Sequence, residues 1–184
     1  EQFERCREVL QKELALEPEP ETLELLRRLE QGTTQAKYAF LLKNPDAVPD
    51  APQVLFGREK LLQEMSDLLQ QGQRVLAQGF GGIGKTALAA TLAKTFLKEK
   101  KKPVLWLQVG VDNPDVILEA LARPFDIAQD LAKAEDKTLY LKNVLSNQSL
   151  SLLVLDDVWN AYTLSKVMEA LPQGLPLLVT SRQR

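Results

Sequence analysis

Histidine is absent from the 184-residue chain, and cysteine occurs only once, at Cys6. A lone cysteine can form no disulfide within the chain, and it provides no thiol cluster for a metal. Without histidine the chain also lacks the base of a Ser-His-Asp site. Zinc chemistry and Ser-His-Asp hydrolysis are therefore excluded.

Long apolar runs and an excess of positive charge are also missing. No apolar run approaches the roughly 18 residues of a membrane span, and the polar start at Glu1 has no signal-peptide core. The 23 basic and 25 acidic residues give a net charge of −2, which argues against the basic surface that nucleic-acid binding needs. We therefore expect a soluble, cytoplasmic protein whose partner is neither a membrane nor a nucleic acid.

The N-terminal part of the chain has a helical pattern. Apolar residues recur at spacings of three and four over residues 1–16 and again from Leu23 to Leu29, and the prolines of Glu17–Pro20 separate the two stretches. This pattern predicts a short helical hairpin over residues 1–32.

A change in composition then marks a domain boundary. Residues 33–53 are rich in Thr, Gln and Asn and carry three prolines, which predicts a linker with at most a short helix around residues 38–42. Residues 54–184 form the second predicted domain. With 45% hydrophobic residues, the chain can bury one full α/β core.

Helical and apolar stretches alternate along this second domain. The patterns predict helices at 58–70, 85–98, 114–122 and 135–146, and strands at 74–78, 103–109, 151–155 and 176–180. Short Val- and Leu-rich runs between helices are typical of a parallel sheet that is covered on both faces. We therefore expect an α/β fold, a three-layer sandwich with a mainly parallel sheet, preceded by the helical (TPR-like) hairpin.

One segment has the spacing of a phosphate-binding loop. Residues 79–86 satisfy G-x-x-x-x-G-K-[ST], and they follow a predicted strand and open a predicted helix. Loop amides and the helix N-terminus would attract phosphate oxygens, Lys85 would bind the β- and γ-phosphates, and Thr86 would offer its hydroxyl to Mg²⁺. The sequence thus predicts a P-loop NTPase that binds ATP or ADP with Mg²⁺. The predicted nucleotide contacts in this segment are Gly79, Gly81, Gly82, Ile83, Gly84, Lys85, Thr86 and Ala87.

The same glycines leave two alternatives open. Gly79, Gly81 and Gly84 also fit the G-x-G-x-x-G pattern of a dinucleotide site. That site needs an acid at the end of the next strand, whereas the nearest acid, Asp112, comes later, and Lys85 would have no role. The other alternative is a glycine-rich turn that only packs a helix against a sheet.

Two carboxylates follow a later apolar strand. Asp156 and Asp157 come directly after Ser151–Leu155, in the form of a Walker B element beside the strand that precedes the P-loop. We expect Asp156 to hold Mg²⁺, through water, and Asp157 to orient or deprotonate the attacking water. Without a P-loop upstream, such a pair would be interpreted as a solvated turn.

Charged residues also flank these motifs. In Val54–Glu59 the apolar residues would cover adenine and Arg58 would reach the nucleotide, with the start of a surface helix as the alternative. Leu177–Arg182 is a buried-type strand with a polar end, where α/β sheets present ligand-contacting groups. Arg182 is therefore a candidate γ-phosphate sensor, with an ordinary surface arginine as the alternative.

Taken in order, these motifs resemble those of the NB-ARC family of signalling ATPases. The resemblance rests on Phe56–Glu59, Gly79–Thr86, Leu152–Trp159 and Thr180–Arg182. It implies that Arg58 lies near the adenine and phosphates, that Lys85 and Thr86 bind phosphate and Mg²⁺, that Asp156 binds Mg²⁺ and that Arg182 acts as the sensor. We expect Phe56 to be a further nucleotide contact, and Asp157, Lys85 and Arg182 to be the catalytic residues. The chain departs from the family pattern at Phe56, where a small aliphatic residue is usual, and at Gln183, where an acid is common.

The resemblance also implies a function. The domain would be a slow ATPase used as a switch, closed with ADP and open, with possible self-association, with ATP. The chain starts without methionine, so we expect it to be a fragment, with the family's winged-helix lid following Arg184. The hairpin at 1–32 resembles the end of the bacterial transcriptional activation domain of SARP-type regulators, which implies a multidomain bacterial transcriptional regulator.

Two other functions remain as alternatives. A small-molecule P-loop kinase or transferase would need an acceptor-binding lid, and no arginine-rich lid is evident between Asp112 and Ser149. A scaffold with a degenerate site conflicts with the intact Lys85, Thr86 and Asp156.

Overall fold

The computed structural model describes residues 39–48, 52, 55–110 and 113–182. The chain divides into two compact units, residues 1–36 and residues 37–184, and the second contains every described residue. The predicted N-terminal hairpin, and with it the resemblance to a transcriptional activation domain, lies outside the described residues.

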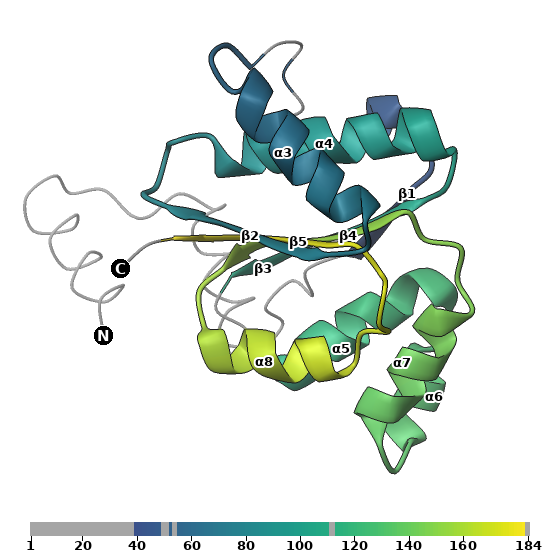
Figure 1. Cartoon of the computed structure of the whole chain (residues 1–184). Helices are drawn as coiled ribbons and strands as arrows, with labels where there is room; N and C mark the ends of the chain where they lie inside the picture. Colours follow the sequence, from purple (N-terminus) through teal and green to yellow (C-terminus); the bar gives the residue numbers. More distant parts are fainter. Residues whose placement is uncertain (1–38, 49–51, 53–54, 111–112, 183–184) are drawn as a thin grey trace, which may run out of the picture. The chain divides into compact units, whose positions relative to one another are not determined.

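The second unit is built around a five-stranded sheet (Figure 1). Its strands are β1 (Ala39–Leu42), β2 (Arg74–Gly79), β3 (Val104–Gly110), β4 (Leu152–Val158) and β5 (Leu177–Arg182). Its α-helices are α3 (Glu59–Gln70), α4 (Lys85–Lys100), α5 (Pro114–Ala122), α6 (Ala128–Lys133), α7 (Lys137–Ser146) and α8 (Ala161–Glu169), and two 3₁₀ turns are η1 (Pro45–Ala47) and η2 (Arg123–Phe125).

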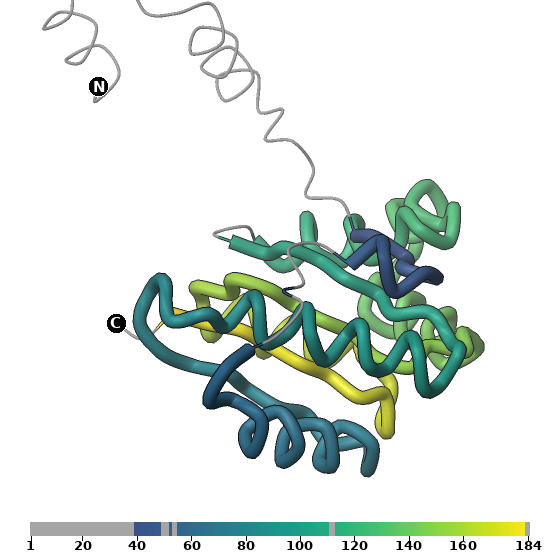
Figure 2. The backbone as a smooth tube through the Cα atoms, turned by 90° about the horizontal axis from the view of Figure 1, so that it is seen from above, coloured from purple at the N-terminus to yellow at the C-terminus, as the bar shows by residue number. Residues whose placement is uncertain are grey.

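The strands lie in the order β1-β3-β4-β5-β2, which Figure 2 shows from above. All neighbours are parallel except β1, which pairs antiparallel with β3. The predicted α/β class with a mainly parallel sheet is confirmed. The prediction that the Walker B strand lies beside the P-loop strand is wrong, because β5 separates β4 from β2. This order places the polar end of β5 between the two motifs.

Helices cover both faces of the sheet (Figure 1), with α3 and α4 on one face and α5 to α8 on the other. Each face of the sheet has its own hydrophobic core, because successive side chains of β3 point to opposite faces. Val104 and Trp106 pack with Phe96 of α4, whereas Leu105 and Leu107 pack with helices of the opposite face. Because a parallel strand in this position is buried on both sides, it reads as a continuous apolar run. The result is the expected three-layer sandwich.

Part of the predicted linker belongs to the sheet. The short helix expected around residues 38–42 is instead strand β1, whose residues pair with Val104–Leu107 of β3. An isolated helix of five residues is unstable, whereas an apolar strand gains hydrogen bonds and burial at a sheet edge. Leu42 and Val48 are both buried in the core beneath α4.

Two helices were not predicted. The first, α6, has only six residues, too few to show a clear period. The second, α8, is capped at its N-terminus by Asn160, whose Oδ1 accepts hydrogen bonds from the backbone N–H groups of Tyr162 and Thr163 at 2.8 and 3.3 Å. This side-chain cap is a start signal that the sequence does contain. No helix in the described ranges is both long and apolar enough to cross a membrane.

Candidate nucleotide-binding site

The predicted P-loop connects the end of β2 to the start of α4. Gly82 and Gly84 have φ angles of 80° and 91°, in the left-handed region that glycine adopts without strain. Gly84 is also the N-cap of α4, so the free N–H groups of the first helical turn follow directly. Such a turn at a helix N-terminus makes an anion-binding concavity.

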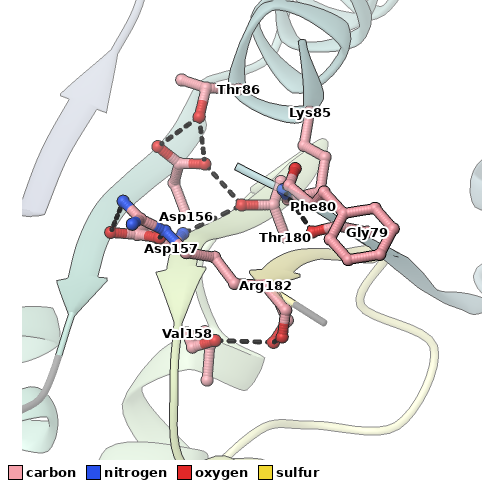
Figure 3. A network of polar contacts seen from close by, with 10 residues as sticks. Gly79, Phe80, Lys85, Thr86, Asp156, Asp157, Val158, Thr180 and Arg182 are labelled. Carbon is pink, nitrogen blue, oxygen red and sulfur yellow. Dashed lines mark hydrogen bonds and ion pairs between the residues drawn. The ribbon is translucent and has the colours of Figure 1, made fainter. Parts of the chain in front are cut away.

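The ammonium group of Lys85 lies over this loop. Its Nζ donates hydrogen bonds to the carbonyl oxygens of Gly79 and Phe80, both at 2.8 Å (Figure 3). An ammonium group has three N–H donors, so one remains for a further acceptor. The loop thus carries a full positive charge beside its amides.

The second motif meets the P-loop through a direct contact. The hydroxyl of Thr86 donates to both carboxylate oxygens of Asp156, at 3.0 and 3.2 Å, although the two residues are 70 positions apart (Figure 3). Asp156 is only 3% exposed, and Thr180 donates a further hydrogen bond of 2.6 Å to its Oδ1. These bonds compensate the burial of a charged group.

This arrangement fits Mg²⁺. The cation prefers oxygen ligands and is usually held by one or two carboxylates together with phosphate oxygens and water. Asp156 and Thr86 supply one carboxylate and one hydroxyl at the same place. Among the described residues no group of three or more His, Cys, Asp or Glu side chains is placed to hold a metal alone.

Asp157 has an unusual backbone conformation and an ion-pair partner. Its φ angle is 58°, at an irregularity in the pairing of β4 with β5. Its backbone N–H donates to the hydroxyl of Thr180 at 2.9 Å, and its Oδ1 lies 3.0 Å from Nε of Arg182. The Arg182 guanidinium lies 4.5 Å from the centroid of the Trp159 ring. Arg182 therefore contacts both the second carboxylate and an aromatic face (Figure 3 shows the ion pair).

Two cavities lie on either side of Gly84 and Lys85, which line both. The polar cavity, of about 380 Å³, is lined by Gly81, Gly82, Gly84, Lys85, Thr86, Ala87, Gln108, Asp156, Asp157, Thr180 and Arg182. The apolar cavity, of about 270 Å³, is lined by Leu55, Arg58, Leu61, Met65, Val75, Leu76, Ala77, Gln78, Ile83, Gly84, Lys85 and Leu88. We call them the phosphate cavity and the apolar cavity.

The structure brings most of the predicted site residues to these cavities. Gly79 lines neither cavity but accepts the Lys85 hydrogen bond. Phe56 also lines neither and is 85% exposed, whereas the adjacent Leu55 lines the apolar cavity.

Sequence reasoning did not assign a role to Thr180 or Gln108, which both line the phosphate cavity. A polar residue at the carboxyl end of an apolar strand was the available signal for both. This signal can be used only when the strand order is known, because only that order shows which strand ends lie together.

A glycine-rich loop at the start of α4, with a lysine over it and a buried aspartate on the following threonine, defines the class of P-loop NTPases. Within this class the chain belongs to the NB-ARC family, since the model of the NB-ARC domain matches residues 58–184.

Individual relatives were also found. Over 155 residues the chain is 29% identical to apoptotic protease-activating factor 1 of Homo sapiens, a match that covers 74% of this chain and 12% of that protein. The chain therefore spans about an eighth of the length of this curated relative. Among solved structures, the DnaC helicase loader matches with a TM-score of 0.42 and 17% identity, over 77% of each chain.

Proposed function

We propose that this domain binds ATP and ADP with Mg²⁺ and uses them to switch a larger protein between two states. The observation that carries the proposal is the contact of Thr86 with Asp156, because it joins the two motifs that a bound nucleotide would bridge. A glycine-rich turn with a packing role only gives no reason for a buried carboxylate against its threonine. A dinucleotide site likewise leaves both Lys85 and this contact without a role.

The two cavities match the two halves of a nucleotide. The phosphate cavity offers backbone amides, Lys85 and the candidate metal ligands, so it suits the triphosphate. The apolar cavity is lined mainly by aliphatic side chains, with Arg58 at its margin, so it suits a purine ring. A bound Mg²⁺ would neutralise charge on the β- and γ-phosphates. Leu55 replaces Phe56 as the residue we propose to contact the base.

The switch requires that the γ-phosphate interact differently with two conformations, since only differential affinity shifts a population. Arg182 lines the phosphate cavity, and among the described residues its guanidinium contacts the side chains of Asp157 and Trp159, so a rotamer change can release it. In the proposed cycle Arg182 stays paired with Asp157 while ADP is bound, and this is the closed state. ATP then draws the guanidinium to the γ-phosphate and favours an open, self-associating state, which slow hydrolysis reverses.

The larger setting rests on resemblance alone. The proposed protein is a multidomain bacterial transcriptional regulator, in which residues 1–32 end an activation domain and a lid follows the nucleotide-binding domain. A small-molecule kinase is the competing proposal, and transfer of the γ-phosphate to an added acceptor would favour it.

Nucleotide titration of the purified chain tests the proposal. Lys85→Ala should abolish Mg²⁺-dependent binding of ATP and ADP in calorimetry, because it removes the full positive charge over the loop. Lys98→Ala is the matched control, since Lys98 is an exposed lysine in the last turn of the same helix. Equal affinities for wild type and Lys85→Ala would contradict nucleotide binding at this loop.

A second measurement addresses hydrolysis. Asp157→Ala should lower the rate of ATP hydrolysis while leaving nucleotide binding intact, because the hydrogen bonds of Asp157 go to Thr180 and Arg182 and not to the P-loop. Unchanged turnover would remove Asp157 from the mechanism.

A further inference from the structure

Three neighbouring strands carry a polar residue near their carboxyl ends, on the same face of the sheet. On the face covered by α4, β3 presents Val104, Trp106 and then Gln108, and β4 presents Leu152, Val154 and then Asp156. β5 presents Leu178 and then Thr180. On this face each strand therefore changes from apolar to polar residues where it passes beneath the start of α4. We call Gln108, Asp156 and Thr180 the polar row.

Members of the polar row lie next to one another. Gln108 and Asp156 are register partners in the parallel pair of β3 and β4, so their Cα atoms are separated by about one strand spacing, roughly 4.8 Å. Side chains at paired positions of a parallel sheet project to the same face. Thr180 and Asp156 are hydrogen-bonded. All three residues line the phosphate cavity.

Gln108 differs from its two neighbours in exposure and bonding. Asp156 and Thr180 are buried, and each is engaged in hydrogen bonds. Gln108 is the one exposed residue of β3, whose other six positions are buried, and its carboxamide makes no hydrogen bond to any residue that the structure describes. A polar side chain at this position adds nothing to the core, but it can act in the cavity.

Hydrolysis needs a group that holds a water molecule in line with the γ-phosphate. In this conformation the carboxylate of Asp157 is paired with Arg182, whereas the carboxamide of Gln108 has no such partner among the described residues. A carboxamide suits the task because its oxygen accepts from a water O–H and its nitrogen donates to an oxygen. A glutamine orients the attacking water in P-loop GTPases.

We propose that Gln108 is a catalytic residue that orients the water attacking the γ-phosphate. This inference rests on the proposed nucleotide binding. The water oxygen forms a bond to the γ-phosphorus while the bond from that phosphorus to the β–γ bridging oxygen breaks. ADP leaves, and the proton of the water passes to the released phosphate. Gln108 holds the water by hydrogen bonds and takes no proton.

Three variants of the purified chain test the assignment. Gln108→Leu removes both hydrogen-bonding functions at similar size, and Gln108→Glu keeps an acceptor. Gln148→Leu is the control, since Gln148 is an exposed glutamine just before β4, at the end of that strand opposite Asp156. For each variant, the affinity for ATP, the single-turnover rate of hydrolysis and the affinity for ADP with Mg²⁺ and aluminium fluoride, a mimic of the transferring phosphoryl group, are measured.

Gln108→Leu should bind ATP as wild type does, hydrolyse it more slowly by on the order of 100-fold, and bind ADP–aluminium fluoride more weakly. Gln108→Glu should retain more turnover, and Gln148→Leu should match wild type.

Several results would overturn the proposal. The first is unchanged turnover of Gln108→Leu, and the second is a loss of ATP affinity in this variant equal to its loss of turnover. The third is recovery of its turnover at higher Mg²⁺, which would make Gln108 a metal-site residue. A wild-type chain that binds ATP but neither hydrolyses it nor binds ADP–aluminium fluoride would also overturn it. A wild-type chain that binds no nucleotide, or binds it equally with Lys85→Ala, contradicts the proposed function instead.

Discussion

Arg182 and Asp157 hold each other through a contact of 3.0 Å between Nε and Oδ1. The Arg182 side chain is 49% exposed and the Asp157 side chain 24%, so the pair is not locked in the core. Exposed ion pairs of this kind contribute only about 0–1 kcal/mol. A γ-phosphate, which carries more charge than a carboxylate, can therefore compete for the guanidinium at low cost.

Loss of Arg182 should reduce discrimination between the two nucleotides. We expect Arg182→Ala to weaken ATP binding more than ADP binding, while the free energy of unfolding changes by less than about 1 kcal/mol. Arg182→Lys should restore discrimination only in part, because lysine lacks the planar fork that pairs and stacks at once. Calorimetric titration with both nucleotides measures the ratio, and an equal loss of both affinities would contradict a sensor role.

Trp159 should report the movement of Arg182. The chain has two tryptophans, and Trp106 is buried in the sheet at 3% exposure, away from this contact. If ATP draws the guanidinium off the indole ring, the fluorescence of Trp159 should change more with ATP than with ADP. The change should persist in Trp106→Phe and vanish in Trp159→Phe. A signal that survives in Trp159→Phe would mean that another segment reports the nucleotide.

Thr180 should prove important for both stability and metal binding. Its buried hydroxyl donates to Asp156 and accepts from the backbone of Asp157. Thr180→Val keeps the shape but removes the acceptor of the Asp157 N–H and one of the donors to Asp156, and an unsatisfied buried polar group costs about 1–3 kcal/mol. We expect a matching decrease in urea stability and weaker Mg²⁺ binding. Thr180→Ser, which keeps the hydroxyl, should lose much less of both, and equal losses would point to packing of the methyl group instead.

The P-loop glycines should differ in how they tolerate a side chain. A Cβ at Gly84 would meet nothing within 4 Å, so the cost of Gly84→Ala comes from the backbone, whose φ of 91° is strained for alanine. We expect a loss of about 1–3 kcal/mol in unfolding free energy and weaker nucleotide binding. Gly81 has equally open space and no positive φ. Gly81→Ala should therefore leave stability unchanged in the same denaturant titration, and an equal loss would contradict this account.

Local sequence was sufficient for much of the fold. The P-loop, the strands on either side of α4 and the apolar strand before Asp156 all follow from periodicity and residue type, because these signals act over a few neighbouring positions. Local patterns do not determine which strands lie side by side. The insertion of β5 between β4 and β2 was therefore missed, as was the pairing of Ala39–Leu42 with β3.

The same limit applies to the site. Lys85, Thr86 and Asp156 were assigned from motifs, and the structure brings Thr86 and Asp156 into contact. The role proposed for Gln108 depends on its register with Asp156. The pairing of Arg182 with Asp157 depends on the bulge in β4. Such relationships depend on long-range packing, which a motif does not specify.

The bulge at Asp157 also affects how firmly the strand ends are joined. Before it, β4 and β5 are in regular register at Leu153–Leu155, and beyond it they pair again at Val158 and Ser181. Two side-chain hydroxyls add to the pairing here: Thr180 accepts from the backbone N–H of Asp157, and Ser181 donates to the carbonyl of Val158. A side-chain rotamer changes far faster than a strand pair separates. Because Val158 still pairs with Ser181 and Arg182 with Gly79, the side chains of Asp157 and Arg182 can change rotamer around a ligand while the strand ends stay in the sheet.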